Sequence, residues 1–411
     1  MFLSRGQLAE LPSARPRHNA SPRALWTMVG PAFVAAIAYI DPGNFATNFS
    51  AGASYGYRLF WVVIASNSVA VLIQFLSAKL GVATGRDLAT ICRDEFSRPV
   101  TVLLWLQAEA VAVATDLAEV VGGAVALRLL LGVPLVAGGV LTALTSIALL
   151  RIQNRSTRRF EAAIIVILLA CALAFGYLLS RTGASAAGLA GGLLPGFAGN
   201  DSVLLATGML GATVMPHVVF VHSALTSDRY RQLRSTAGER RAILRVLKLD
   251  VLLAMGVAGL MNAAMLVIAA QGIGRHRPGA SDTLVEVHSQ LGQRWGPSTA
   301  AVFAVALLLS GVASTAVGAY AGQVVMAGFL HRVVPLFLRR SVALVPALLL
   351  LSCASPTTVL LWSQVALSIG IPFTLLPLLI FTSRRTVMGP WVNRVATTAL
   401  GLLISVLIIA I

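Results

Sequence analysis

The chain has 411 residues, of which 57% are apolar and only 11% are charged, and its mean hydropathy is +0.84. A soluble domain carries about twice this share of charged residues, so the composition argues against a water-soluble globular protein. The net charge is +16, but the basic residues are spread over short gaps between apolar runs, which favours membrane topology over a nucleic-acid-binding surface. We therefore expect a protein that crosses the lipid bilayer many times and binds no nucleic acid.

Eleven apolar runs approach or exceed the roughly 20 residues that a helix needs to cross a bilayer. In chain order they span about 25–52, 58–84, 100–127, 132–150, 160–180, 202–226, 246–270, 297–330, 335–353, 357–382 and 391–411. Residues 1–24 hold four arginines and no apolar stretch, so we expect a cytoplasmic tail rather than a cleaved signal peptide. Residues 25–411 are then one transmembrane domain, and its widely spaced cysteines predict neither a disulfide framework nor a zinc site.

The basic residues between these runs predict the orientation of the chain. With eleven segments, 25 of the 31 lysines and arginines fall on the side of the N-terminus and six on the opposite side. Cytoplasmic loops are enriched in lysine and arginine, so we expect the N-terminus in the cytoplasm and the C-terminus outside. Lys79, near the inner end of the second segment, is expected to extend its ammonium group to the cytoplasmic interface.

Proline interrupts the first and the sixth segments in their middles. Residues 38–44 read AYIDPGN and residues 212–217 read ATVMPH. Proline removes a backbone donor, and non-helical backbone at membrane depth survives only where it is buried in protein or lines a cavity. The prolines could merely kink ordinary helices, but a carboxylate inside the first break, Asp41, favours a functional site.

The positions of the two breaks also suggest an internal repeat. Segments one to five, about 25–180, and six to ten, about 202–382, would form two halves that each begin with a broken helix. Interrupted helices at corresponding places in two halves are typical of inverted-repeat transporters and point to the binding site. The last segment, about 391–411, would be an addition outside the repeat.

The side chains at the two breaks form a mixed set of candidate metal ligands. Asp41 offers an anionic oxygen, Asn44 a neutral oxygen, and unwound backbone near Ala38 and Ala212 offers carbonyl oxygens. Met215 offers a thioether sulfur, which favours softer transition metals over calcium or magnesium. Core packing is the commonest use of methionine, but the position of Met215 directly before the break favours a ligand. The set suggests a divalent first-row metal such as manganese or iron.

These motifs resemble the two signature helices of the Nramp family. The resemblance is carried by residues 41–45 (DPGNF), 212–217 (ATVMPH) and 222–225 (HSAL), and it extends over about 25–411. It implies a proton-coupled manganese and iron transporter with the LeuT-type fold, which is not an enzyme. It also implies metal held by Asp41, Asn44 and Met215, with the Ala212 and Ala38 carbonyls contributing in different states. Val218 stands where many members have asparagine, at a position that is not a family metal ligand.

The third segment carries three carboxylates, Glu109, Asp116 and Glu119, at spacings that place them on one helix face. Such a stripe must face the protein interior or water, and it is suited to passing protons or to pairing with buried arginines. The family resemblance supports a proton route in which Asp116 and Glu119 match its acids and Arg339 and Arg340 match its basic partners. Asp41 would belong to this route as well as to the metal site.

Three further polar residues are candidates. His217 can titrate near neutrality, ligate metal or simply form hydrogen bonds at the break, and the resemblance favours a role in gating or proton coupling. Gln364 is typical of interhelical hydrogen bonding, and the resemblance suggests that it approaches the metal in an occluded state. Asn262 resembles a family outer-gate residue.

The sequence thus predicts a proton-coupled importer of Mn²⁺, with Fe²⁺, Co²⁺ and Cd²⁺ as alternative substrates, that works by alternating access. We expect it to act as a monomer in the inner membrane of a bacterium, with no cofactor besides the transported ion. The alternative is a sodium- or proton-coupled symporter of amino acids or other organic solutes with the same fold, whose carboxylate substrate Asp41 would repel. An intramembrane metal enzyme would need a motif such as H-E-x-x-H, which the sequence lacks.

Overall fold

The computed structural model describes residues 30–155, 157–230, 237–272, 283–330 and 336–410, and within these ranges all regular secondary structure is helical. The helices before the second break are α2 (Pro31–Ala38), α3 (Pro42–Tyr55), α4 (Phe60–Thr84), α5 (Leu88–Glu95), α6 (Arg98–Leu131), α7 (Leu135–Arg155), α8 (Thr157–Thr182), α9 (Ala186–Gly192) and α10 (Asn200–Thr213). Those after it are α11 (Pro216–Tyr230), α12 (Ala237–Gly272), α13 (Thr283–Trp295), α14 (Pro297–Leu330), α15 (Leu336–Cys353), α16 (Pro356–Ser383), α17 (Arg385–Met388), the 3₁₀ turn η1 (Gly389–Trp391) and α18 (Val395–Ala410).

Each of the eleven predicted segments coincides with one helix or, for the first and the sixth, with a pair of helices. Among the described residues, seven helical stretches are long and apolar enough to cross a membrane, and three shorter apolar helices accompany them. Large apolar side chains are exposed on the outer faces of several of these helices, including Leu103, Leu173, Leu260, Ile369 and Val406. In a soluble protein such a surface would aggregate, whereas a bilayer solvates it. The predicted tail, residues 1–24, lies outside the described residues.

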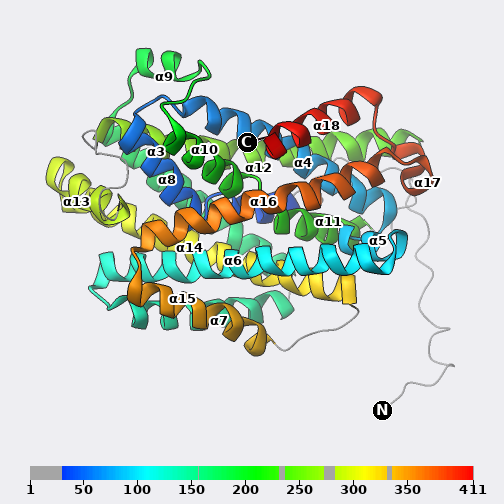
Figure 1. Ribbon diagram of the computed structural model, residues 1–411, viewed down its shortest axis with the longest axis horizontal. Coiled ribbons are helices and arrows are strands. Elements are labelled where there is room, and N and C mark those ends of the chain that lie inside the picture. Colours follow the sequence, from blue (N-terminus) through cyan, green and yellow to red (C-terminus); the bar gives the residue numbers. More distant parts are fainter. Residues whose placement is uncertain (1–29, 156, 231–236, 273–282, 331–335, 411) are drawn as a thin grey trace.

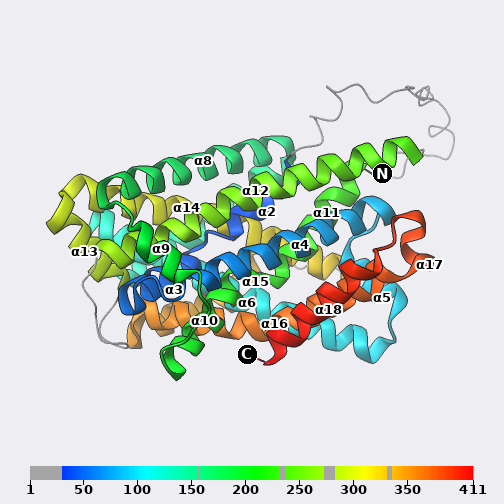
Figure 2. The same cartoon turned by 90° about the horizontal axis from the view of Figure 1, so that it is seen from above.

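The two broken helices lie in the interior of the bundle. The long helices α6 and α14 run side by side, and α16 and α12 lie nearby along the same long axis (Figure 1, Figure 2). Helix α2 contacts α8, α11, α12 and α14, and α3 contacts α10, α12 and α16. Every residue of α2 except Phe33 is buried as a consequence. Polar groups within the first break are therefore held away from lipid.

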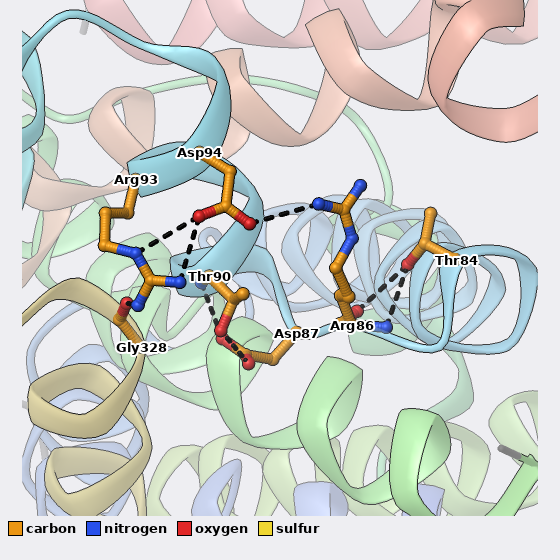
Figure 3. Close-up of polar contacts among 7 residues, drawn as sticks. All are labelled: Thr84, Arg86, Asp87, Thr90, Arg93, Asp94 and Gly328. Carbon is orange, nitrogen blue, oxygen red and sulfur yellow. Dashed lines mark hydrogen bonds and ion pairs between the residues drawn. The ribbon is translucent and has the colours of Figure 1, made fainter. Parts of the chain in front are cut away.

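A short helix, α5, connects α4 to α6 at one end of the bundle and was not expected from the sequence. Gly85 adopts the left-handed conformation that ends α4, and Asp87 then caps α5 by accepting a hydrogen bond from the backbone N–H of Thr90 at 2.9 Å. Arg93 donates to the carbonyl of Gly328 in α14 and pairs with Asp94 at 2.9 Å (Figure 3). These contacts fix α5 against the end of α14.

Candidate functional site

The first break separates α2 from α3 by three residues, Tyr39 to Asp41. Helix α3 begins with Pro42, which needs no donor at the first helical position. Asp41 caps this helix, because its Oδ1 accepts a hydrogen bond from the backbone N–H of Asn44 at 2.8 Å. The Asp-Pro-Gly-Asn motif therefore starts a second helix in the middle of the segment and places a carboxylate at its N-terminal end.

The unwound backbone of this break finds its hydrogen-bond partners on other helices. Asn262 of α12 donates to the carbonyl of Tyr39 at 2.9 Å, and Ser310 of α14 donates to the carbonyl of Ile40. The Ala38 carbonyl accepts from the backbone N–H of Asp41 at 3.2 Å. A break buried in a membrane protein requires this compensation, since lipid supplies no hydrogen bonds. Asn262 also accepts from the side chain of Asn48 at 2.9 Å, so it ties the end of α2 to α3.

The second break separates α10 from α11 by Val214 and Met215, and Pro216 begins α11. The backbone N–H of Val214 still bonds to the Leu210 carbonyl at 2.7 Å. The helical ladder then stops, because the N–H of Met215 does not continue it and Pro216 has no N–H, so the next two carbonyls along α10 lose their helical partners. The carbonyl of Ala212 is one of these, because Pro216 four residues later has no N–H to donate. Met215 is 1% exposed and belongs to the main apolar cluster of the bundle.

The two breaks meet at the side chain of Asn44. Its Nδ2 donates to Asp41 Oδ1 at 2.8 Å and to the Ala212 carbonyl at 2.9 Å. On the other side of the amide, the hydroxyl of Thr213 lies 3.5 Å from Asn44 Oδ1. Three of the predicted ligands are thus in direct contact, and Met215 follows Ala212 within the same break.

Gln364 of α16 reaches the same region from a third direction. Its side chain packs over Gly43, where an added Cβ would lie 2.1 Å from Gln364 Nε2. Among the described residues, neither Gln364 Oε1 nor Asp41 Oδ2 has a hydrogen-bond partner, although both atoms are buried. A buried acceptor without a partner is destabilising by about 1–3 kcal/mol, and more when it is charged. A cation bound beside these oxygens would relieve that penalty.

The predicted carboxylate stripe lies on α6, directly beside the first break. Asp116 and Glu119 are 3% and 1% exposed, and Glu109 is half-buried. One turn after Glu119, Gly122 packs so closely on Pro42 that an added Cβ would lie 2.0 Å from the proline ring. The stripe is therefore adjacent to the metal-site candidates rather than spread over a lipid face.

His217 connects the second break to this stripe. It is 2% exposed, and its Nδ1 lies 3.3 Å from the hydroxyl of Thr115, the neighbour of Asp116. Arg339 and Arg340 lie in the first turns of α15, but their side chains are outside the described residues. Their predicted pairing with the stripe stays a prediction.

Several residues of this region were not singled out from the sequence. Ser310 and Thr213 bond to atoms of the two breaks, and Gln74 of α4 donates to the hydroxyl of Tyr39 at 2.6 Å. Gln74 also contacts His222 Nδ1 at 2.8 Å, which gives that histidine a structural partner. An isolated polar residue in an apolar run was the available signal in each case.

Gly211 permits the close approach of α10 and α16 beside the site. A Cβ added there would lie 2.0 Å from the backbone carbonyl oxygen of Gln364, whereas one added at Gly208 would make only ordinary contacts at 3.4 Å or more. We expect Gly211→Ala to lower stability by about 1–3 kcal/mol, because backbone must move, and to reduce transport. Gly208→Ala should be neutral or slightly stabilising. Thermal unfolding of both variants checks this, and equal melting temperatures would contradict it.

Two helices broken at membrane depth, with their breaks joined by one buried polar cluster, define a secondary transporter. Among the described residues no group of three or more His, Cys, Asp or Glu side chains could hold a metal ion. A family model described as "Natural resistance-associated macrophage protein-like" matches residues 32–411, and the chain belongs to the Nramp family.

Individual relatives agree with this assignment. A Bacillus subtilis protein named Divalent metal cation transporter MntH is 46% identical over 391 residues, which are 95% of this chain and 91% of that protein. The crystal structure of a manganese transporter from Eremococcus coleocola is 27% identical, with a TM-score of 0.84 over 95% of this chain and 87% of that chain. A structure of MhsT with L-phenylalanine is 16% identical and has a TM-score of 0.57 over 92% of this chain and 98% of that chain. This likeness indicates a shared fold and nothing more.

Proposed function

We propose that this protein imports divalent transition-metal ions, Mn²⁺ first among them, across a bacterial inner membrane, and that a proton gradient drives this transport. As an Nramp-family member related to divalent metal cation transporters, it is a multi-pass membrane transporter and not an enzyme. The observation that carries the proposal is the direct contact of Asp41, Asn44 and Ala212 between two broken helices. Fe²⁺, Co²⁺ and Cd²⁺ are the alternative substrates that the same ligands would accept.

The present arrangement suggests how a metal ion enters the ligand set. Asn44 Nδ2 now donates to the two oxygens, Asp41 Oδ1 and Ala212 O, that would bind the ion. A divalent cation replaces these donor hydrogens, and rotation of the Asn44 amide then turns its oxygen toward the ion. Met215 adds its sulfur from the second break, and Gln364 and the Ala38 carbonyl contribute in other states of the cycle. The proposal includes a functional monomer, in which one chain supplies all of these ligands.

The breaks also supply the hinges for alternating access. Helix α2 can move relative to α3, and α10 relative to α11, because no continuous ladder of backbone hydrogen bonds joins them. Asn262 is the proposed gate between α2 and α3, and its hydrogen bonds to Tyr39 and Asn48 support this role. The distribution of basic residues supports a cytoplasmic N-terminus and an external C-terminus.

Metal binding requires Asp41 in its ionised form, so loading releases a proton whenever the carboxyl carries one. The stripe of Glu109, Asp116 and Glu119 begins beside Pro42 and provides a route for that proton along α6. His217 joins the route through Thr115, and Arg339 and Arg340 are its proposed basic partners.

The proposal is tested by uptake into proteoliposomes. Manganese should enter faster at acidic than at neutral external pH, and a large excess of magnesium or calcium should compete poorly. Protein-free liposomes and Asp41→Asn protein in the same lipid are the controls. Uptake that is independent of pH would refute proton coupling, and uptake of an amino acid driven by sodium would support the symporter alternative. Asp41 argues against that alternative, because its charge repels a substrate carboxylate.

Asp116→Asn is expected to reduce metal-driven proton movement by at least about tenfold, because an amide cannot relay a proton. Manganese affinity should change much less, since none of the proposed ligands is altered. Internal acidification measured with a pH-sensitive dye, beside manganese binding by calorimetry, separates the two effects. Glu95→Gln, an exposed carboxylate-to-amide change in α5, is the matched control. Parallel losses of binding and proton flux would instead indicate that Asp116 is structural.

A further inference from the structure

A groove of about 710 Å³ lies on the side of the bundle, away from the two breaks. It is bounded by α4, by α12 and by the segment 390–397, which contains the end of η1 and the start of α18. Figure 2 shows α4 between α12 and α18. The groove lies along the second half of α4 and the first half of α12.

Among the described residues, the lining of this groove holds no acidic side chain and four cationic ones: Lys79, Arg245, Lys248 and Arg394. They come from three separate segments, and none of them forms an ion pair with an acidic residue in the described part of the chain. Like charges gathered without counter-charges repel one another. The groove is therefore complementary to an anion.

Lys79 is the most constrained of the four. It is 6% exposed, so its ammonium does not extend freely to the interface as the sequence suggested. Its ammonium donates to a neutral acceptor, the Oδ1 atom of Asn393, and Asn393 is itself oriented by a 2.9 Å hydrogen bond to the hydroxyl of Thr382. An ammonium group has three donors, and burying it beside a single neutral acceptor is unfavourable. A second, anionic acceptor in the groove would compensate.

Apart from Ser68 and Thr397, the rest of the lining is apolar. Along α4 the groove follows Ser68, Leu72, Phe75 and Lys79, which lie on one face of the helix. At a rise of 1.5 Å per residue, the eleven steps from Lys79 to Ser68 cover about 16 Å, comparable to a large part of one acyl chain. The groove thus has a cationic end and an apolar arm along a membrane-spanning helix.

We propose that this groove binds an anionic phospholipid. The phosphate lies among the four cations and contacts Lys79, while an acyl chain follows Leu72 and Phe75 toward the membrane centre. A free phosphate ion would use the cations but leave the apolar arm unused, and a neutral lipid would leave the cations unpaired. Basic pockets between membrane helices are the expected recognition sites for such head groups.

The lipid would join α12 to α18 across α4. Two residues after Lys248, Asp250 of α12 accepts hydrogen bonds from the backbone N–H groups of Gly30 and Ala32, both at 3.2 Å, at the start of α2. A head group that fixes this end of α12 therefore also supports the anchor of the first broken helix. The expected consequence is higher thermal stability of the whole transporter in the presence of the lipid.

The test uses purified full-length protein in a neutral detergent, titrated with phosphatidylglycerol, phosphatidylcholine or soluble glycerol phosphate. Binding is followed by native mass spectrometry and by the melting temperature. Of the three ligands, only phosphatidylglycerol should bind and raise the melting temperature. The triple variant Arg245→Gln, Lys248→Gln, Arg394→Gln should weaken its binding by about 100-fold, at about fivefold for each cation. These three side chains are exposed, so the variant should fold.

The matched control is Arg241→Gln with Arg385→Gln, which removes exposed charges outside the groove on α12 and α17. It should bind the lipid as the parent does. Equal binding of phosphatidylcholine, an equal shift with glycerol phosphate, or an equal loss in the control would each overturn the proposal. Replacing Lys79 with glutamine should weaken phosphatidylglycerol binding further, and unchanged binding would exclude Lys79 from the site.

Discussion

Replacing Asp41 with asparagine is expected to abolish manganese uptake while leaving the protein folded in the membrane. The substitution removes the carboxylate that lies at the contact between the two breaks but keeps a side chain that caps helices well. The hydrogen bond to the backbone of Asn44 can therefore persist, and the start of α3 is preserved. Loss of a residue that merely supports a metal ligand typically reduces affinity 10- to 100-fold, so removing an anionic ligand should reduce it by about 100-fold or more. Asp41→Ala should have the same effect on uptake and lose about 1 kcal/mol with the cap.

Manganese uptake and binding calorimetry on the same preparations measure this effect. Asp201→Asn is the matched control, because it changes an exposed carboxylate in the first turn of α10 to an amide. The control should transport normally and melt at the same temperature as the parent. If Asp41→Asn took up manganese like the parent protein, the ligand set proposed for the two breaks would be wrong.

The helices could be predicted closely, because lipid imposes a strong constraint on the length and polarity of a membrane-spanning segment. The eighth segment, predicted over 297–330, is α14, Pro297–Leu330. Gly296, with a φ of 93°, and Pro297 mark its beginning locally, so no tertiary information was needed. Pro42 and Pro216 marked the breaks, but Pro346, Pro372 and Pro377 lie inside continuous helices, so proline alone does not predict a break. The carboxylate of Asp41 directly before Pro42 was the additional signal.

The partners of the breaks could not be predicted in this way. Ser310 and Gln74 are visible in the sequence as polar residues in apolar helices, but their targets depend on how α14 and α4 are rotated and crossed. Lys79 was expected at the interface and is buried, because the segment after α17 covers it. Short helices such as α5 and α13 were missed because they lie in connections where the membrane imposes no periodicity.

Met215→Ala is expected to change selectivity more than it changes manganese transport. Hard ions such as calcium and magnesium bind oxygen and retain water, and a thioether is a poor ligand for them. Manganese accepts the sulfur modestly and cadmium accepts it more strongly. Without the sulfur, Asp41, Asn44 and the carbonyls form an all-oxygen site, in which water can occupy the space that Met215 fills. Calcium and magnesium should then compete about tenfold better or more, because one site ligand no longer disfavours them.

Competition measurements decide between this role and a packing role for Met215. Uptake of manganese is measured against excess calcium, magnesium or cadmium for the parent, Met215→Ala and Met255→Ala. Met255 of α12 is a fully buried methionine of the same apolar cluster. Its truncation therefore controls for the cavity that a Met→Ala change leaves, which lowers stability by about 2–5 kcal/mol. In Met215→Ala, cadmium should lose more affinity than manganese, whereas Met255→Ala should destabilise the protein without changing the order of ions. If Met215→Ala rejects calcium to the same degree as the parent protein, the methionine only packs and selectivity is set by the oxygen ligands.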